Sequence, residues 1–478
     1  MEISTVNHSF NDAIRQIVQL FFDIAEDIKV KSVLEEDGFN LIAFAEIFVN
    51  DKKGTGKATA KITAERRFVS DLIKKSVSLA CREISDMPSP WGISTGIRPA
   101  KEARRMLDEG KTDIEILSFL EQEMWITEEK ALLSLDVAKR EKEILKNKRE
   151  NGASIYVGIP FCPTRCAYCS FISQAVAHNE KFIEPYVKAL IKEIEATAKL
   201  CEKRGDSIET IYFGGGTPTA LSVQNLRTLI DAVKKNFDVS NLREFTVEAG
   251  RPDTFTEEMV SMLYDSGVKR ISINPQTMND KTLKLIGRCH SASQTVDAFK
   301  MAKKYDFSIN ADLIAGLPEE NAEDFKYTMD ELLKLEPDAV TVHTMYLKRA
   351  ARLIDEFSKY RFVTEANSMV SYAKLKLEEN GYNPYYLYKQ KNTLGNLENT
   401  AFAKSGHECL YNIYIMEEVQ TIFALGGGAS TKIVKDGEIS RIYNPKDAAD
   451  YIRRIDEITE KKGFLNSPDR KKAKLFNE

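Results

Sequence analysis

Residues 156–171 read YVGIPFCPTRCAYCSF and bring Cys162, Cys166 and Cys169 within eight residues, in the spacing C-x3-C-x2-C. Closely spaced thiolates of this kind hold iron–sulfur clusters. Three ligands are one short of the four that a [4Fe–4S] cluster takes, so the spacing predicts a cluster with one iron open to another molecule. Zinc is the alternative metal, but a zinc site usually takes four protein ligands, and no second cysteine pair follows.

The other four of the seven cysteines have no partner at ligand spacing. Cys81 and Cys201 fall on apolar helical stripes, where a free cysteine behaves as a small hydrophobe. Cys289 and Cys409 are isolated in the sequence. We therefore predict a single metal centre, at Cys162, Cys166 and Cys169.

The bulk composition is that of an ordinary globular protein. The chain has 478 residues, of which 43% are hydrophobic and 29% charged, with a net charge of -4. This length favours two or three domains, and the charge gives no reason to expect nucleic-acid binding. We see no secretory signal and no apolar run of the about 20 residues that span a bilayer. These features predict a cytoplasmic protein, in which cysteines stay reduced and available to metal.

The cysteine stretch resembles the radical S-adenosylmethionine (SAM) enzymes, and in particular the oxygen-independent coproporphyrinogen III oxidase group. The segments GIPFC (residues 158–162) and GGGTPT (residues 214–219) are most similar to its Gram-positive coproporphyrinogen dehydrogenase branch. The resemblance is strong over about residues 150–350. It is weaker elsewhere, although Pro90–Pro99 and Gln390–Leu397 also look like that branch.

Short apolar strands alternate with amphipathic helices from residue 154 onward. Strands are predicted at 154–159, 209–213, 243–248, 268–274, 307–313 and 338–343, and helices at 180–203, 222–236, 256–266, 293–305 and 321–335. Repeated β-then-α units indicate a parallel sheet with helices outside it. Because a full barrel has eight units, six predict a partial (β/α)6 barrel, which is also what the resemblance implies.

The flanking regions have other patterns, and we expect three domains. Residues 1–150 are predicted to form an N-terminal accessory α/β domain, with a strand at 39–49 and helices near 10–25 and at 64–84, 99–109, 112–123 and 127–149. The radical SAM core spans 151–350. Residues 351–478 are predicted to form a substrate-covering region, mainly α with some strand.

Polar residues and glycines stand where the predicted strands end, the edge at which barrels of this type carry their active residues. Gly214–Thr217 follow the second strand, where glycines allow close backbone approach and supply N–H groups. Asp312 ends an otherwise apolar strand, and a carboxylate there is costly to bury unless it is paired or bound to a ligand. By resemblance, the SAM-contacting positions are Tyr156, Tyr168, Gly215, Gly216, Thr217, Glu248, Gln276, Arg288, Asp312 and Tyr346. A capping or ion-paired role is the alternative for each one.

The resemblance also implies the chemistry. A reduced cluster on Cys162, Cys166 and Cys169 would pass an electron to SAM, and the resulting 5′-deoxyadenosyl radical would take a hydrogen atom from a tetrapyrrole substrate. For coproporphyrinogen III, two propionates would lose CO2 and become vinyl groups, giving protoporphyrinogen IX. No catalytic residue is assigned beyond the cluster, and a flavodoxin or ferredoxin is the implied reductant.

One position departs from the family pattern. The well-characterised oxidases carry a fourth cysteine two residues after the third, and this chain has Phe171 there. Relatives without that cysteine include haem-trafficking proteins, so a haem-binding chaperone and a haem-modifying radical SAM protein are the alternative functions. The cluster and SAM motifs do not separate these functions, because all of them keep the same ligands.

Two groups of residues outside the SAM set are weaker candidates for binding haem or substrate. His343 and His407 are candidate haem or substrate contacts, although each is more often a locally bonded histidine. Tyr382, Tyr385, Tyr386 and Tyr388 lie near Lys389 and Lys391, and could offer aromatic surface and cations to a carboxylate-bearing ring. A packed tyrosine cluster is the alternative.

Overall fold

The computed structural model describes residues 1–22, 26–62, 65–169, 173–346, 365–390, 393–435 and 437–463. The chain splits into two compact units. Unit 1 combines Met1–Lys139 with later segments that include Leu387–Glu398, and unit 2 takes most of the chain from Arg140 onward. The three predicted domains stay a prediction.

Unit 1 contains a four-stranded sheet in the order β1-β2-β3-β4. Its strands are β1 (Glu2–Val6), β2 (Ile28–Asp37), β3 (Asn40–Val49) and β4 (Lys52–Lys61), and its helices are α1 (Asn11–Phe21), α2 (Arg66–Ile84), α3 (Lys101–Asp108), α4 (Asp113–Ser118) and the start of α5 (Glu128–Leu145). Alternate residues of β3 are buried, as a strand with one covered face requires. The predicted strand at 39–49 and the predicted helices of this region are present, whereas β1, β2 and β4 were not predicted.

Helix α2 packs directly on β4, which explains two glycines of that strand. A Cβ added at Gly54 would lie 2.1 Å from the Ala80 carbonyl oxygen, and one at Gly56 would lie 2.0 Å from the Ser76 oxygen. No side chain fits at that separation. The two glycines therefore allow the close approach of strand and helix.

The segment Leu387–Glu398 completes the core of unit 1. Glu398 is buried and accepts hydrogen bonds from Trp91 Nε1 at 2.9 Å and from Lys130 Nζ at 2.8 Å. Lys389 is also buried and donates from Nζ to the Ser94 carbonyl at 2.9 Å. Leu387 belongs to the same hydrophobic cluster as the first helices. Residues 268 to 307 positions apart in the sequence thus share one core.

Unit 2 is built on an eleven-stranded sheet in the order β13-β14-β12-β11-β10-β9-β8-β5-β15-β16-β17. Six of these strands pair in parallel and match the predicted β/α units. They are β5 (Gly152–Ile159), β8 (Ser207–Gly215), β9 (Glu244–Glu248), β10 (Arg270–Ser272), β11 (Ser308–Ala315) and β12 (Ala339–Thr344). The predicted partial barrel is confirmed.

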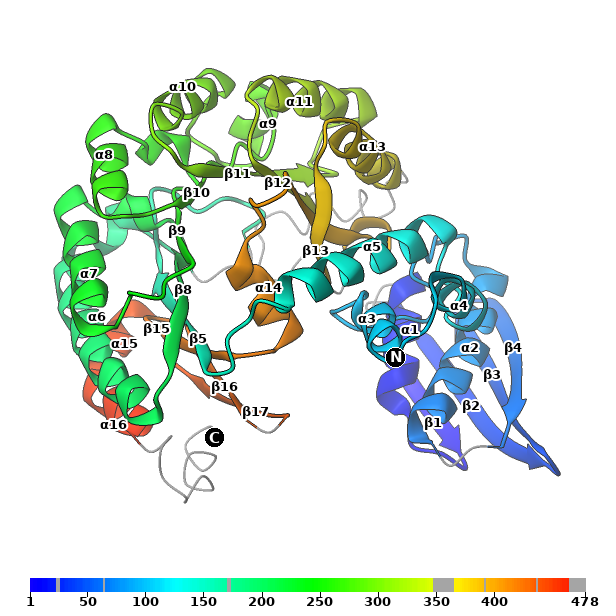
Figure 1. Cartoon of the computed structure of the whole chain (residues 1–478). Coiled ribbons are helices and arrows are strands. Elements are labelled where there is room, and N and C mark those ends of the chain that lie inside the picture. The colour runs from blue at the N-terminus through cyan, green and yellow to red at the C-terminus, as the bar shows by residue number, and fades with distance from the viewer. Residues whose placement is uncertain are drawn as a thin grey trace. The chain divides into compact units, whose positions relative to one another are not determined.

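Helices cover the outer side of this curved sheet (Figure 1). They are α6 (Val176–Arg204), α7 (Val223–Asn236), α8 (Glu257–Asp265), α9 (Asp280–Leu285), α10 (Ala292–Ala302) and α11 (Ala322–Lys334). Local sequence sets their starts, because Ser291 and Asn321 form capping boxes at α10 and α11. Among the described residues, none of the helices combines the length and apolarity needed to cross a membrane.

The C-terminal region adds helices and also five strands to unit 2. Its elements are α13 (Glu365–Glu379), β13 (Asn383–Lys389), β14 (Glu398–Ala403), α14 (Leu410–Glu417), β15 (Thr421–Leu425), β16 (Ser430–Lys435), β17 (Glu438–Tyr443), α15 (Ala448–Arg453) and α16 (Ile455–Gly463). Strand β15 pairs in parallel with β5, and β14 pairs antiparallel with β12. The C-terminal region therefore extends both edges of the six-stranded core.

Helix α14 lies on the inner side of the curved sheet (Figure 1). Its N-terminus is held by Glu244, whose carboxylate accepts hydrogen bonds from the N–H groups of Leu410 at 2.6 Å and Tyr411 at 3.2 Å. A carboxylate at this end of a helix satisfies free N–H groups and favours the helix dipole. The Tyr411 ring stacks on Tyr212 with 4.6 Å between centroids. Helix α14 thus fills the barrel interior from the end where the strands begin.

We predict that Lys130→Met lowers the free energy of unfolding of unit 1 by about 3–5 kcal/mol, because it removes the buried cation that is hydrogen-bonded to the Glu398 carboxylate. Urea unfolding followed by tryptophan fluorescence measures this change, since both tryptophans of the chain, Trp91 and Trp125, lie in unit 1. Lys53→Met is the matched control, because its ion pair with Glu46 is exposed and screened by solvent. Equal losses in the two variants would contradict the prediction.

Candidate functional site

The three predicted cluster ligands lie on one loop at the carboxyl end of β5. Cys162 ends the short strand β6 (Phe161–Cys162) and is buried, while Cys166 and Cys169 are partly exposed. The Cys169 N–H donates to the Cys166 carbonyl at 3.1 Å, which closes a tight turn. Burial raises the pKa of the Cys162 thiol, and the nearby charges of Cys169 and Cys166 raise it further. Cys166 and Cys169 therefore lie close enough to Cys162 for their charges to act on its thiol.

The residues present fit an iron–sulfur cluster by the chemistry of their donor atoms. The donor set is three cysteines on one loop, the chemistry that an iron–sulfur cluster requires.

The glycine turn after β8 holds the cysteine strand in place. The N–H groups of Gly216 and Thr217 donate to the carbonyls of Ile159 at 2.8 Å and Phe161 at 2.7 Å. A Cβ on Gly216 would lie 2.6 Å from the Phe161 oxygen and 3.0 Å from Cys162 Sγ. These two N–H groups, which we expected to face a ligand, are therefore already used by the backbone. The role of Gly215, Gly216 and Thr217 as SAM contacts stays a prediction.

Glu248 ends β9 and faces two tyrosines of the barrel interior. Its Oε1 accepts a hydrogen bond from Tyr212 OH at 2.6 Å. Burial raises the pKa of Glu248 to about 7, and the negative charge of Asp312 acts in the same direction. Tyr156, on β5, stacks on Tyr212 and Tyr411 with centroid distances of 6.2 and 5.9 Å. This carboxyl group can therefore change its protonation state near neutral pH.

Arg288 and Tyr168 connect the cysteine loop to the ends of β9 and β10. Arg288 is buried and donates from Nη2 to Tyr168 OH at 2.9 Å. Its Nη1 reaches the carbonyl oxygens of Gly250 and Asn274, each at 3.2 Å. Two predicted SAM-contacting residues are thus in direct contact beside the cysteines.

Gln276 offers a buried polar group with no partner in this structure. Its side-chain Oε1 is buried and makes no hydrogen bond. Its backbone has a φ of 68°, a left-handed conformation that is uncommon for residues other than glycine. The N–H of Gln276 donates to the Asp312 carbonyl at 3.0 Å, which fixes this conformation against β11. An unpaired buried acceptor is what a ligand-binding position would offer, and the role of Gln276 as a SAM contact stays a prediction.

Asp312 and His343 lie together on the neighbouring strands β11 and β12. His343 Nε2 is 3.6 Å from Asp312 Oδ2, and Asn310 Nδ2 donates to Asp312 Oδ1 at 2.8 Å. Burial acts to raise the pKa of Asp312, but the interactions with His343 and Asn310 more than offset it, so the pKa lies below its usual value. Tyr346 follows β12 and is half-buried.

Other candidates lie elsewhere in the fold or outside the described residues. His407 hydrogen-bonds to Ser308, the first residue of β11. The cysteine loop lies at the carboxyl ends of the strands, so His407 lies at the opposite ends. Lys389 is buried in unit 1, where burial lowers its pKa to about 7. Tyr385 is fully buried, as a packed tyrosine cluster predicts. Phe171 and Lys391 lie outside the described residues.

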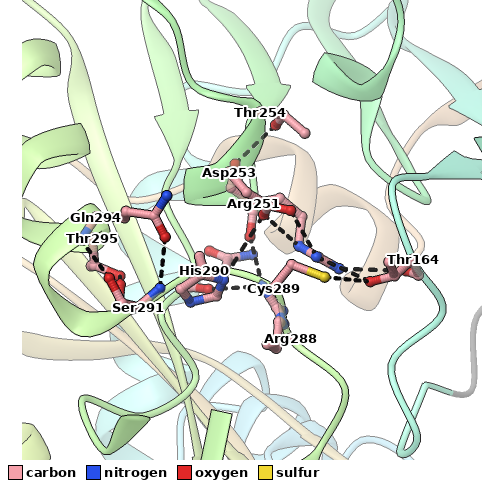
Figure 2. A network of polar contacts seen from close by, with 12 residues as sticks. Thr164, Arg251, Asp253, Thr254, Arg288, Cys289, His290, Ser291, Gln294 and Thr295 are labelled. Carbon is pink, nitrogen blue, oxygen red and sulfur yellow. Dashed lines mark hydrogen bonds and ion pairs between the residues drawn. The ribbon is translucent and has the colours of Figure 1, made fainter. Parts of the chain in front are cut away.

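Sequence reasoning missed a polar network beside the cysteine loop, shown in Figure 2. Arg251 Nη1 lies 3.6 Å from Cys166 Sγ, and its guanidinium is bound by Asp253. Cys289 Sγ lies 3.8 Å from the Thr164 hydroxyl, on the loop between the first two cluster cysteines. Arg251 follows β9 at the same edge as Glu248, so the strand-end rule that selected Glu248 could also have selected it.

Comparison with known proteins places this site in a family. The Radical SAM superfamily matches residues 156–332. The chain is 40% identical over 380 residues to the oxygen-independent coproporphyrinogen-III oxidase-like protein HemZ of Bacillus subtilis, covering 78% of this chain and 76% of that protein. It is 32% identical to the heme chaperone HemW of Lactococcus lactis, covering 64% of this chain and 76% of that one.

A solved structure gives the same fold. Coproporphyrinogen III oxidase (HemN) from Escherichia coli aligns with a TM-score of 0.51 and 22% identity, over 69% of this chain and 73% of that one. The sequence likeness to HemZ extends over most of both chains. The chain therefore belongs to the radical SAM family of oxygen-independent coproporphyrinogen III oxidase-like proteins, enzymes that use a [4Fe–4S] cluster and SAM.

Proposed function

We propose that this chain oxidatively decarboxylates two propionates of coproporphyrinogen III to vinyl groups, giving protoporphyrinogen IX. The observation that carries the proposal is the 40% identity to HemZ over most of both chains. In each decarboxylation a hydrogen atom leaves the propionate β-carbon, the carboxylate departs as CO2, and one electron passes to an acceptor. A flavodoxin or ferredoxin is the proposed reductant, and the proposed location is the cytoplasm.

We assign the cluster to Cys162, Cys166 and Cys169. When bound, the cluster and SAM together supply the radical chemistry that removes the hydrogen atom. The protein's own residues bind and orient these groups and exclude water. The proposed SAM-binding residues are Tyr156, Tyr168, Gly215, Gly216, Thr217, Glu248, Gln276, Arg288, Asp312 and Tyr346.

The chemistry of these side chains matches the groups that SAM carries. SAM has a cationic sulfonium and amino group, a carboxylate, hydroxyls and an adenine. Glu248 and Asp312 can accept from cationic and hydroxyl groups, and Arg288 can hold a carboxylate. The free Gln276 Oε1 can accept from a donor of the ligand. The stacked Tyr156, Tyr212 and Tyr411 rings close the barrel interior below these groups and keep water from that side.

A haem chaperone is the second candidate. The likeness to HemW of Lactococcus lactis and the phenylalanine at position 171 both support it. A chaperone of this kind would keep the cluster and SAM residues and would bind haem without oxidising coproporphyrinogen. His343, beside Asp312, is then the proposed haem contact.

We expect the reconstituted enzyme, given SAM, a reductant, coproporphyrinogen III and an electron acceptor without oxygen, to yield a porphyrin that has lost two carboxyl groups. Mass spectrometry of the tetrapyrrole measures this loss. SAM cleavage with an unchanged tetrapyrrole would rule out the decarboxylase, and haem binding by the same sample would then support the chaperone.

We predict that Cys166→Ala loses the cluster and reduces SAM cleavage to background. The loss should exceed the about 10–100-fold effects of changing groups that only support metal ligands. Iron and sulfide content, together with release of 5′-deoxyadenosine, measure the two effects. Cys289→Ala is the matched control, because this thiol is exposed near the same loop but is not a proposed ligand. A full cluster in Cys166→Ala would contradict the assignment.

We also predict that SAM affinity rises between about pH 5.5 and about pH 7.5. Glu248 is largely protonated below its pKa of about 7 and is an anion above it. The anion can hold a cationic group of SAM, so SAM affinity should rise by up to about tenfold per pH unit below that pKa. Glu248→Gln should weaken binding at the higher pH and remove this gain. Equilibrium binding of SAM to the wild type and to Glu248→Gln measures this gain. The titration of SAM itself changes both affinities equally, so it cancels from their ratio. A pH-independent ratio would contradict the role of Glu248.

A further inference from the structure

We propose that Arg251, with its counter-ion Asp253, sets the reduction potential of the cluster held by Cys162, Cys166 and Cys169. The proposal rests on the cluster site described above and goes beyond it. It assigns a positioning and tuning role to two residues outside the cysteine and SAM-binding sets.

Arg251 contacts the cysteine loop at three points. It lies three residues after the end of β9, and its side chain is only 3% exposed. The Nη1 nitrogen lies 3.6 Å from Cys166 Sγ. It also lies 3.4 Å from the Thr164 carbonyl oxygen, and Nη2 lies 3.2 Å from the Thr164 hydroxyl (Figure 2). A buried guanidinium therefore donates toward a ligand sulfur and toward the backbone that carries it.

Asp253 fixes the orientation of this guanidinium. Its two carboxylate oxygens accept from Arg251 Nε and Nη2, each at 2.9 Å. The rigid fork of an arginine leaves little freedom once two of its edges are bound. Thr254 adds a further support, because its hydroxyl donates to the Arg251 carbonyl at 2.8 Å. The edge that carries Nη1 is thereby held toward Cys166.

The charges of Arg251, Arg288 and Asp253, which pack against the loop, sum to a positive value. Arg251 and Arg288 each contribute +1 and Asp253 contributes -1, which gives +1. His290 Nδ1 lies 3.9 Å from Asp253, but burial and the charge of Arg288 lower its pKa to about 4, so it is neutral at pH 7. Arg251 is therefore the nearest positive charge to the Asp253 carboxylate and neutralises it.

This charge acts on the two redox states unequally. Three thiolates on a [4Fe–4S]2+ core give a net charge of -1, and one-electron reduction makes it -2. A nearby cation and a hydrogen bond to a ligand sulfur both stabilise the more negative state. Both are among the factors that set the reduction potential of a cluster. Arg251 therefore raises the potential and makes the cluster easier to reduce, while Asp253 limits this effect.

The two residues predict shifts of opposite sign. Arg251→Gln removes the cation and leaves Asp253 uncompensated, so the midpoint potential should become more negative. Asp253→Asn removes the anion and leaves Arg251 uncompensated, so the potential should become more positive. A general loss of packing would not produce opposite signs.

The test is a redox titration of the reconstituted proteins, followed by the electron paramagnetic resonance signal of the reduced cluster. Arg453→Gln on α15 is the control, because its side chain is 76% exposed and solvent screens its charge. We expect the wild-type potential in the control and opposite shifts in the two variants.

The outcomes separate the two proposals. A wild-type protein that binds no cluster would overturn the proposed cluster site itself. Unchanged potentials, or shifts of the same sign, in variants that carry a full cluster would overturn only the role of Arg251 and Asp253. Failure of both variants to bind a cluster, with native circular dichroism, would also overturn that role and assign the pair to loop structure.

Discussion

Two backbone hydrogen bonds, from Gly216 and Thr217 to the carbonyls of Ile159 and Phe161, fix where the cysteine loop begins. They extend the parallel pairing of β5 with β8 past the end of both strands, so sheet register sets the position of Cys162. The rest of the site is attached to this loop, since Arg251 contacts Cys166 and Arg288 contacts Tyr168. A side chain at position 216 would separate the two segments, which makes this glycine a structural requirement of the cluster loop.

The site combines ionisable groups of both signs near the carboxyl ends of the strands. Glu248 ends β9 and Asp312 lies within β11, whereas the buried Arg251 and Arg288 lie beside the cysteines. Each of these groups has a hydrogen-bonding partner, as burial requires, and those partners hold the side chains in place before any ligand arrives. A ligand with separate cationic and anionic ends therefore meets preorganised groups for both.

Much of the core fold could be predicted from sequence, because each strand and helix of the six units carries its own periodic pattern. The cysteine loop was equally readable, since its spacing is local. Tyr212, Tyr411 and Arg251 were missed because their roles depend on contacts between segments distant in sequence. The strands β13 to β17 were not individually predicted, because their positions are set by pairing with the edges of the sheet rather than by a local pattern.

The sharing of one core by the first 139 residues and the segment Leu387–Glu398 has a consequence for synthesis. Unit 1 cannot complete its core until the chain has been made as far as Glu398, about 259 residues (398 − 139) beyond Lys139. At about 5–20 residues per second this is a delay of roughly 13–52 s. During that interval Lys130 has no Glu398 to pair with, and the apolar surface that Leu387 later covers stays open. The N-terminal segment of the nascent chain therefore keeps an incomplete core while most of unit 2 is being made.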